Sequence, residues 1–278
     1  MVAQLRQRLL ALQRASGIKH GPGTQPFLIP AIDAVLGGGF LRGALHEIAA
    51  AGEAHLPAAA GFALRVARRS APSPRLFWIT EDMGLVESGA PHGAGLDAFG
   101  LAPEQLVMVS AAHRRDLLWA MEEALRCRAV DAVIGEMRTG EIDSVAARRL
   151  SLAAAESGAL ALLLRAAPPS DASTAATRWI VGAVSSFVIP EREQSERTRN
   201  DKEIRPRFAA QLIRNRRGPV GSWILEWSDS DEQLILATHA QPVDAPAFDR
   251  SHRQVASVLL AADRDRQAWQ CRSSHRRR

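Results

Sequence analysis

Short apolar runs that alternate with helical patterns constrain the fold of this chain most strongly. Five runs have the length and composition of buried strands. They are Ala44–Ala49, Arg75–Thr80, Leu106–Ser110, Val130–Ile134 and Ala159–Leu164. Helical patterns lie between them, at Pro57–Arg69, Arg114–Arg128 and Ile142–Ser157. This alternation predicts an α/β fold, with a mostly parallel twisted sheet that is covered by helices on both faces.

The sheet is expected to end in antiparallel strands at one edge. After the fifth strand, the stretch WIVGAVSSFVI returns to strand character. Residues 191–207 carry six basic and five acidic side chains, which is typical of an exposed excursion. Phe208–Arg214 and Trp223–Trp227 then flank NRRGPVGS, the pattern of a hairpin with a glycine-containing turn.

The rest of the chain divides by composition. Residues 1–16 form an amphipathic helix pattern, which could pack on its own domain or on a neighbouring subunit, and residues 17–30 are a glycine- and proline-rich linker. We assign 31–240 to the core domain and 241–278 to a basic, partly disordered tail. No apolar run reaches the roughly 18 residues of a membrane span, and the N-terminus lacks signal-peptide features, so we expect a cytoplasmic protein without membrane contact.

Positive charge is concentrated near the C-terminus. Residues 250–278 contain eight arginines and two aspartates, whereas residues 1–249 have a net charge of −1. Such an end is either a solvated tail or an arm that contacts DNA, with Arg276, Arg277 and Arg278 as its last cations.

A second basic cluster is predicted in the hairpin turn. Arg214, Arg216 and Arg217 lie near Trp223 and Trp227 and could contact DNA or a protein partner. Base stacking on the tryptophans is one interpretation. Their alternation with Leu225 favours the other, one face of a packed sheet.

The sequence offers no pattern for a metal site or a nucleophilic site. Cys127 and Cys271 are far apart and are expected to be reduced thiols. His46, His55 and His113 have no partner at ligand spacing, and there is no G-x-S-x-G motif.

Residues 47–64 occupy the place of a phosphate loop, between a strand and a helix, but lack its chemistry. A working loop reads G-x-x-x-x-G-K-[ST], in which the lysine reaches the phosphates and the hydroxyl holds magnesium. Counting five residues from Gly52 leads to Pro57, which Ala58 follows. The only lysines, Lys19 and Lys202, lie outside any glycine-rich turn after a strand. We therefore expect no ATP or magnesium cofactor.

The order of motifs resembles that of the RecA recombinase core. IDAVLGGGFLRGALHEIAA (residues 32–50) is similar to the segment that leads into the recombinase phosphate loop. FWITEDMGLVESGAPHGAGLDAFGLAPEQLVMVS resembles the segment with the catalytic glutamate, and AVDAVIGEM resembles the Walker B strand. Together with the degenerate loop and AQLIRNRRGPVGSWILEW, the pattern resembles the ImuA family over roughly residues 25–240.

This resemblance implies where remnants of a nucleotide site would lie. Gly52 and Glu53 fall in the degenerate loop, Glu136 falls at the Walker B carboxylate, and Asp82 or Glu81 falls at the water-orienting glutamate. Without the lysine and the hydroxyl, we expect no catalytic residue among them. Gly37, Gly38 and Gly39 precede the strand, so they are interpreted as a backbone turn.

In a RecA core the loops after the fourth and fifth strands face DNA. The resemblance places Arg138, Arg165 and Arg178 in or beside those loops as available cations.

The resemblance also implies a function. ImuA proteins are RecA-like components of SOS mutagenesis cassettes, encoded with an inactive Y-family polymerase homologue (ImuB-like) and an error-prone replicative-type polymerase (DnaE2-like). We expect a non-catalytic accessory protein of translesion synthesis in the DNA damage response, with those polymerases and RecA as partners. Two alternatives remain open: an ATP-dependent RecA paralogue that acts on single-stranded DNA, and a cell-division inhibitor similar to SulA.

Overall fold

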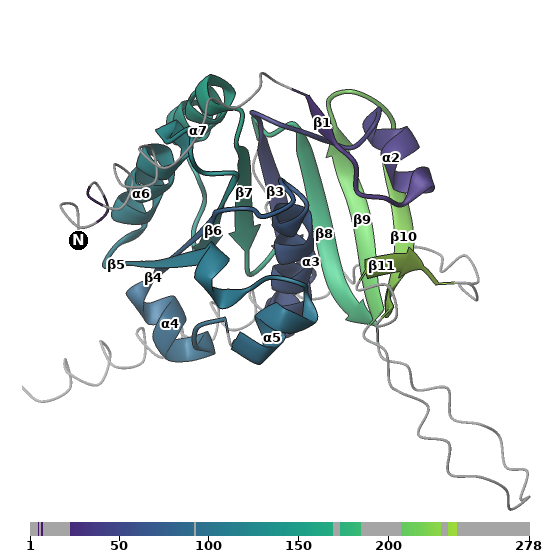
Figure 1. Cartoon of the computed structure of the whole chain (residues 1–278), viewed down its shortest axis with the longest axis horizontal. Helices are drawn as coiled ribbons and strands as arrows, with labels where there is room; N and C mark the ends of the chain where they lie inside the picture. The colour runs from purple at the N-terminus through teal and green to yellow at the C-terminus, as the bar shows by residue number, and fades with distance from the viewer. Residues whose placement is uncertain are drawn as a thin grey trace, which may run out of the picture. The chain divides into compact units, whose positions relative to one another are not determined.

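The computed structural model of the chain (Figure 1) describes Leu5, Gln7 and residues 23–91, 93–168, 173–184, 207–228 and 233–237. The predicted tail at 241–278, with Arg276, Arg277 and Arg278, lies outside the described residues. So do nearly all of the charged stretch at 191–207 and of the predicted N-terminal helix. Of that helix, Leu5 is helical and buried with the side chains of helices α6 and α7 described below.

A nine-stranded sheet organises the described residues, in the order β11-β10-β9-β8-β3-β7-β6-β4-β5. The six strands from β8 to β5 in this order pair in parallel, and β9, β10 and β11 add an antiparallel edge. The strands are β3 (Leu45–Ala50), β4 (Leu76–Glu81), β5 (Leu106–Ala111), β6 (Ala132–Met137), β7 (Leu160–Arg165), β8 (Thr177–Val184), β9 (Arg207–Asn215), β10 (Gly221–Ser228) and β11 (Gln233–Leu236). The predicted parallel sheet with an antiparallel edge is confirmed.

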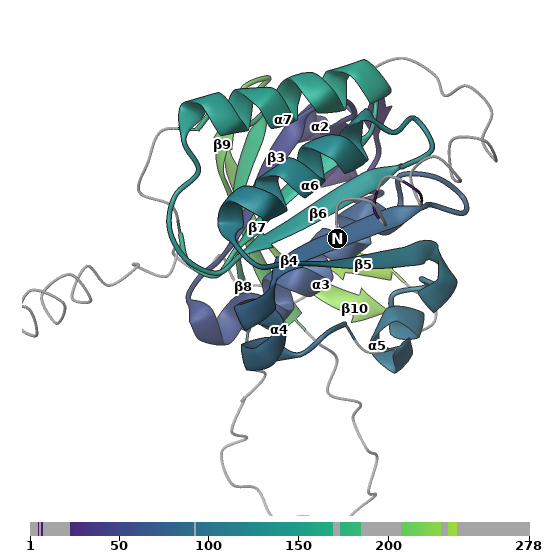
Figure 2. The same cartoon turned by 90° about the vertical axis from the view of Figure 1, so that its left-hand side faces the viewer.

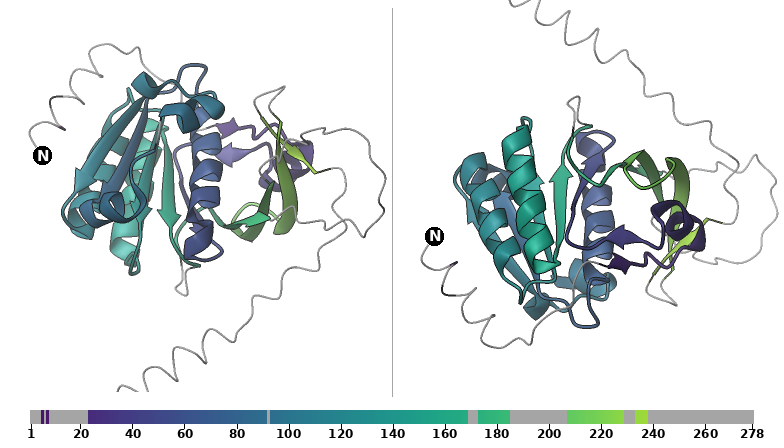
Figure 3. Two further views of the ribbon diagram at one scale, coloured as in Figure 1. Left: turned by 90° about the horizontal axis from the view of Figure 1, so that it is seen from below. Right: turned by 90° about the horizontal axis from the view of Figure 1, so that it is seen from above.

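Helices cover both faces of this sheet. Helix α3 (Leu56–Arg68) packs on one face, against β3, β6, β7 and β8. Helices α6 (Arg114–Arg126) and α7 (Ser144–Ser157) lie side by side on the other face (Figures 2 and 3). Two short helices, α4 (Asp82–Ser88) and α5 (Gly93–Ala98), follow the carboxyl end of β4.

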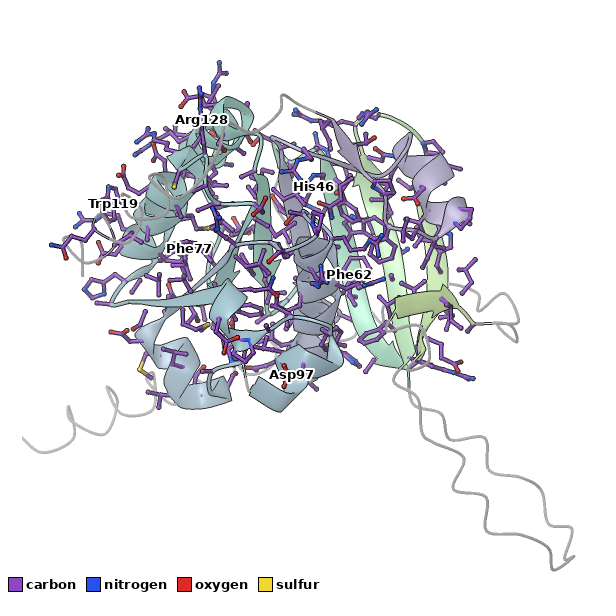
Figure 4. The ribbon with its side chains drawn as sticks, viewed as in Figure 1. His46, Phe62, Phe77, Asp97, Trp119 and Arg128 are labelled. Atoms are coloured by element: carbon purple, nitrogen blue, oxygen red, sulfur yellow. The ribbon has the colours of Figure 1, made fainter. Side chains whose placement is uncertain are left out.

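Alternation along the central strands produces two hydrophobic cores. On β7, Leu160, Leu162 and Leu164 face the α3 side, whereas Ala161 and Leu163 face α6 and α7. Phe62 and Phe77, labelled in Figure 4, belong to the α3 core and to the α6/α7 core respectively. Because the strands are buried on both faces, they read as continuous apolar runs in the sequence.

The beginning of the core domain differs from the predicted linker at 17–30. Residues Thr24–Gln25 form β1, which pairs with β2 (Phe40–Leu41), and Phe27 and Ile29 are buried in the α3 core. The described part of the linker, residues 23–30, therefore packs on the domain. The glycines and prolines favoured a flexible connection, but Phe27 and Ile29 are buried in the α3 core and anchor this segment.

The three consecutive glycines form a turn, as predicted. Gly37 ends helix α2 (Pro30–Leu36) in the left-handed conformation, and Gly38 and Gly39 also have positive φ. A Cβ atom on Gly39 would lie 2.1 Å from the carbonyl oxygen of Gln25. The turn thus needs glycine because the backbone of β1 passes directly beside it.

Candidate functional site

A pocket of about 560 Å³ lies where the resemblance places a nucleotide site. It opens at the carboxyl ends of β4 and β6, between the first half of α3 and the region of α4 and α5. Parallel α/β sheets commonly bind ligands at this edge. The lining is mainly apolar, and its charged members are Glu53, Glu136 and Arg138.

Glu136 lies at the base of this pocket and is buried. The indole Nε1 of Trp78, on neighbouring strand β4, donates a hydrogen bond of 3.0 Å to Glu136 Oε2. Burial raises the pKa of the Glu136 carboxyl, and the bond from Trp78 and the charge of Arg138 offset only part of this effect. The carboxylate that the resemblance places at the Walker B position thus already has a protein partner and lies in surroundings that disfavour its charged form.

The loop between β3 and α3 does not form a phosphate cradle. Gly52 has an extended backbone with φ 178°, and a Cβ atom there would meet nothing within 4 Å, so neither its conformation nor its packing demands glycine. Residues Glu53–His55 then form a 3₁₀ turn that leads directly into α3. His55 Nδ1 accepts a hydrogen bond of 3.2 Å from the Ala183 amide of β8, which fixes this short connection.

Arg138, directly after β6, is the cation of the pocket, and acidic side chains surround it. Its Nη2 lies 2.9 Å from Glu53 Oε1, and its Nε lies 3.3 Å from Glu87 Oε2. It also donates to the hydroxyl of Ser88. These contacts join the degenerate loop to α4, so this guanidinium is already paired within the protein.

The structure does not bring the other candidate carboxylates into this pocket. Asp82 begins α4 and accepts a hydrogen bond from the Ser110 hydroxyl at the end of β5. Neither Asp82 nor Glu81 lines the pocket that contains Glu136. Of the four predicted remnants, Glu53 and Glu136 share the pocket, whereas Gly52 and Asp82 lie outside its lining.

The residues present do not fit a magnesium–nucleotide complex. Among the described residues the lining contains neither lysine nor threonine, and its one described serine, Ser88, is bound by Arg138. Its carboxylates are paired with an arginine or an indole. The one described cation of the lining, Arg138, is already paired with Glu53 and Glu87, so this arrangement offers no unpaired cation for a triphosphate.

The arginines that the resemblance offered for DNA contact are engaged inside the domain. Arg178 on β8 is buried and lies 2.8 Å from the Glu47 carboxylate on β3. Arg165 is buried and donates to the Gly140 carbonyl at 3.0 Å. With Arg138 paired as well, the prediction of available cations at these loops is wrong, because the side chains point into the fold and bind its own acceptors.

The hairpin cluster is more accessible. Arg216 and Arg217 are exposed in the turn between β9 and β10, and Arg214 is half-buried. Arg217 reaches the Gly37 carbonyl at 3.4 Å. Trp223 packs on the α3 core with its ring centroid 5.8 Å from that of Trp179, which agrees with the packed-sheet interpretation.

His46 has a structural role. It is buried on β3, where its Nδ1 lies 2.7 Å from the Thr177 hydroxyl and its Nε2 donates to the Leu41 carbonyl at 2.9 Å. Burial lowers the pKa of His46 to about 4, although the bond to Leu41 acts in the opposite direction. Within the described ranges no group of three histidine, cysteine or acidic side chains could hold a metal ion.

Sequence reasoning missed Trp78 as a site residue. The sequence shows a tryptophan within a strand, and such an indole can reach a carboxylate if the two strands are neighbours. Which strands are neighbours depends on the sheet order, and the sequence alone did not fix that order.

Comparison with known proteins supports the fold. No family profile and no curated protein matches the sequence. The crystal structure of the RadB recombinase is similar to this chain, with a TM-score of 0.52 and 12% sequence identity, over 77% of this chain and 100% of that chain.

The fold is therefore RecA-like. RadB is one of 422 matching chains of solved structures, and a fold shared so widely does not decide function by itself. Function is therefore inferred from the residues of the site.

Among the described residues, no helix is long and apolar enough to cross a membrane.

Proposed function

We propose that this protein is a RecA-like accessory factor of the ImuA type that does not hydrolyse ATP. Its partners in damage-inducible translesion synthesis would be an inactive Y-family polymerase homologue, an error-prone polymerase and RecA. The family resemblance of the motifs and the RecA-like fold support this assignment.

One observation carries the proposal: the charged side chains that line the pocket at the degenerate loop are already paired with each other or with Trp78. Glu53 stands in the loop and binds Arg138, and Glu136 is buried against Trp78. A triphosphate would meet the Glu53 carboxylate, and magnesium would have to displace an indole donor from Glu136. Displacement of the indole from the buried Glu136 would cost free energy that no described lysine in the pocket offsets. The Glu53–Arg138 pair adds less, because the Glu53 side chain is 78% exposed.

Magnesium-dependent ATP hydrolysis tests the non-catalytic part. The wild-type protein and Glu136→Gln are assayed with and without single-stranded DNA, and an active recombinase serves as the positive control. We expect background rates from both proteins. Turnover by the wild type that Glu136→Gln abolishes would refute the proposal and favour an ATP-dependent paralogue.

Co-purification with the named partners tests the rest. Tagged protein is mixed with purified polymerase homologue, error-prone polymerase and RecA, one at a time. We expect stable binding of at least one polymerase-type partner, and failure with all three would contradict the assignment.

An exposed apolar position suits a targeted variant in this assay. Val86 on α4, near the pocket at the degenerate loop, is 78% exposed, and Val145 on α7 is 67% exposed. Because Val86 lies two residues before Ser88 of the pocket lining, Val86→Asp tests whether partners bind beside this pocket, and Val145→Asp is the matched control away from the lining. We expect Val86→Asp to weaken partner binding and Val145→Asp to leave it unchanged.

A further inference from the structure

A second pocket, of about 570 Å³, lies at the C-terminal end of α3. Its lining combines the last turn of α3 and the following residues with β1 and Arg42. The described lining residues include no aspartate or glutamate but four arginines: Arg42, Arg65, Arg68 and Arg69.

Neutral groups hold two of these arginines, Arg42 and Arg68, in place. Arg68 donates to the Gly100 carbonyl and to the Pro72 carbonyl, the latter at 3.2 Å, and Arg42 donates to the Ser70 carbonyl. Carbonyl oxygens at the end of a helix favour nearby cations but do not neutralise them. The guanidinium groups of Arg42 and Arg68 are therefore positioned by carbonyl oxygens while their charges remain.

Burial, together with the charges of neighbouring arginines, lowers the pKa of two of them. Burial, with the charges of Arg69 and Arg68, lowers the pKa of Arg65 to about 10. Burial and the charge of Arg68 lower the pKa of Arg69, and Asp33 offsets part of this shift. A bound anion would relieve this repulsion.

Two buried polar atoms at the pocket have no hydrogen-bond partner among the described residues. They are the Ser70 hydroxyl and the side-chain oxygen Oε1 of Gln25, in residues that are 7% and 5% exposed. The Gln25 Nε2 donates to the Val66 carbonyl at 2.6 Å, which fixes Oε1 as the atom left to accept. Buried groups of this kind usually find a partner, so their presence here points to a ligand.

The sequence before the pocket does not supply a counter-charge. Residues 1–22, which precede β1, contain no aspartate and no glutamate. A carboxylate from this segment therefore cannot neutralise the four arginines.

We propose that this arginine pocket binds the phosphate group of a nucleotide-type ligand, either a phosphodiester of single-stranded DNA or the phosphate of a mononucleotide. Guanidinium groups match phosphate oxygens, and the Ser70 hydroxyl can donate to them. Gln25 Oε1 would accept from a sugar hydroxyl or a base amine. The volume is in the range of small-ligand sites.

This pocket is separate from the degenerate loop and extends the proposed function. The loop lies at the start of α3 and the arginines lie at its end, about 20 Å apart for a helix of this length. An accessory protein could thus contact DNA or a nucleotide without a phosphate loop.

Binding of inorganic phosphate and DNA tests the proposal. Thermal unfolding of the full chain is compared in phosphate and in chloride at equal ionic strength. Fluorescence anisotropy then measures binding of a labelled single-stranded oligonucleotide, with dAMP as competitor. The variants are Arg69→Glu and Ser70→Ala, and Arg148→Glu on the exposed surface of α7 is the control with the same charge change.

We expect phosphate to stabilise the wild type more than chloride does, and Arg69→Glu to remove this gain. Ligand affinity should fall about tenfold in Arg69→Glu and less in Ser70→Ala, while the control stays within about twofold. Competition by dAMP would identify a mononucleotide phosphate, and binding of the oligonucleotide alone would identify the phosphodiester.

Equal weakening in Arg69→Glu and Arg148→Glu would overturn the proposal, because it would indicate nonspecific attraction. Absence of any effect of phosphate or DNA would overturn it as well. Unfolding in chloride checks the fold, and Ser70→Ala keeps the test decisive if Arg69→Glu is unstable. ATP hydrolysis tests the proposed function independently, so either proposal can fail alone.

Discussion

Removal of one partner of the buried ion pair between Glu47 and Arg178 should destabilise the fold severely. The two side chains are register partners on the adjacent strands β3 and β8, 2.8 Å apart, and their side chains are 0% and 7% exposed. Ser173 also donates to Glu47. Substitution of Glu47 by glutamine keeps the size and the acceptor oxygen but leaves the guanidinium charge buried without its carboxylate.

The expected cost follows from this burial. Breaking a buried pair by removal of one partner costs about 3–5 kcal/mol. For a domain of this size each kcal/mol lowers Tm by about 2–4 °C, so Glu47→Gln should lower Tm by roughly 6–20 °C. Urea unfolding followed by circular dichroism measures the free energy, and thermal scans measure Tm.

A surface pair provides the control. Arg207 and Glu226 lie 2.9 Å apart, but their side chains are 36% and 17% exposed, so Glu226→Gln should cost no more than about 1 kcal/mol. Equal losses in Glu47→Gln and Glu226→Gln would refute the reasoning, because they would mean that burial does not set the value of the pair. Replacement of both Glu47 and Arg178 by apolar residues should recover much of the loss.

Three further outcomes are expected. The pKa of His46 is about 4 in the folded protein, against 6.5 for an unperturbed histidine. Its contribution to the free energy of unfolding, up to about 3 kcal/mol, is therefore present at pH 7 and lost as the pH falls from 6.5 to 4. His46→Gln should flatten this pH dependence in urea titrations. The folded pKa of Glu136 is raised, so Glu136→Gln should increase Tm at pH 7, with a gain that disappears below about pH 4.5; a decrease at pH 7 would contradict this. Gly39→Ala should cost about 3 kcal/mol or more because of its φ of 121° and the Gln25 carbonyl, whereas Gly52→Ala should cost less than about 0.5 kcal/mol by the same unfolding assay.

The layered architecture could be predicted from the sequence alone. Runs such as LFWI in β4 and LALLL in β7 are apolar at every position because each strand is buried on both faces, and that property is local. Helix α7 could be located from its composition. Its start at Ser144, two residues later than predicted, is set by the Asp143 side chain, which caps the Ala146 amide at 2.7 Å. The absence of a phosphate-loop lysine could also be read directly from the sequence.

The contacts of the site residues depend on the tertiary structure and could not be predicted from the sequence. The partner of Glu136 is Trp78, which is distant in the chain and becomes a neighbour because β4 lies beside β6. Arg138 and Arg178 looked like free cations, yet acidic side chains from other elements pair with them. The arginine pocket likewise forms only when β1 is placed against the end of α3. Periodicity reports how each element faces the core, but contacts between distant charged groups depend on strand order, which the local pattern does not encode.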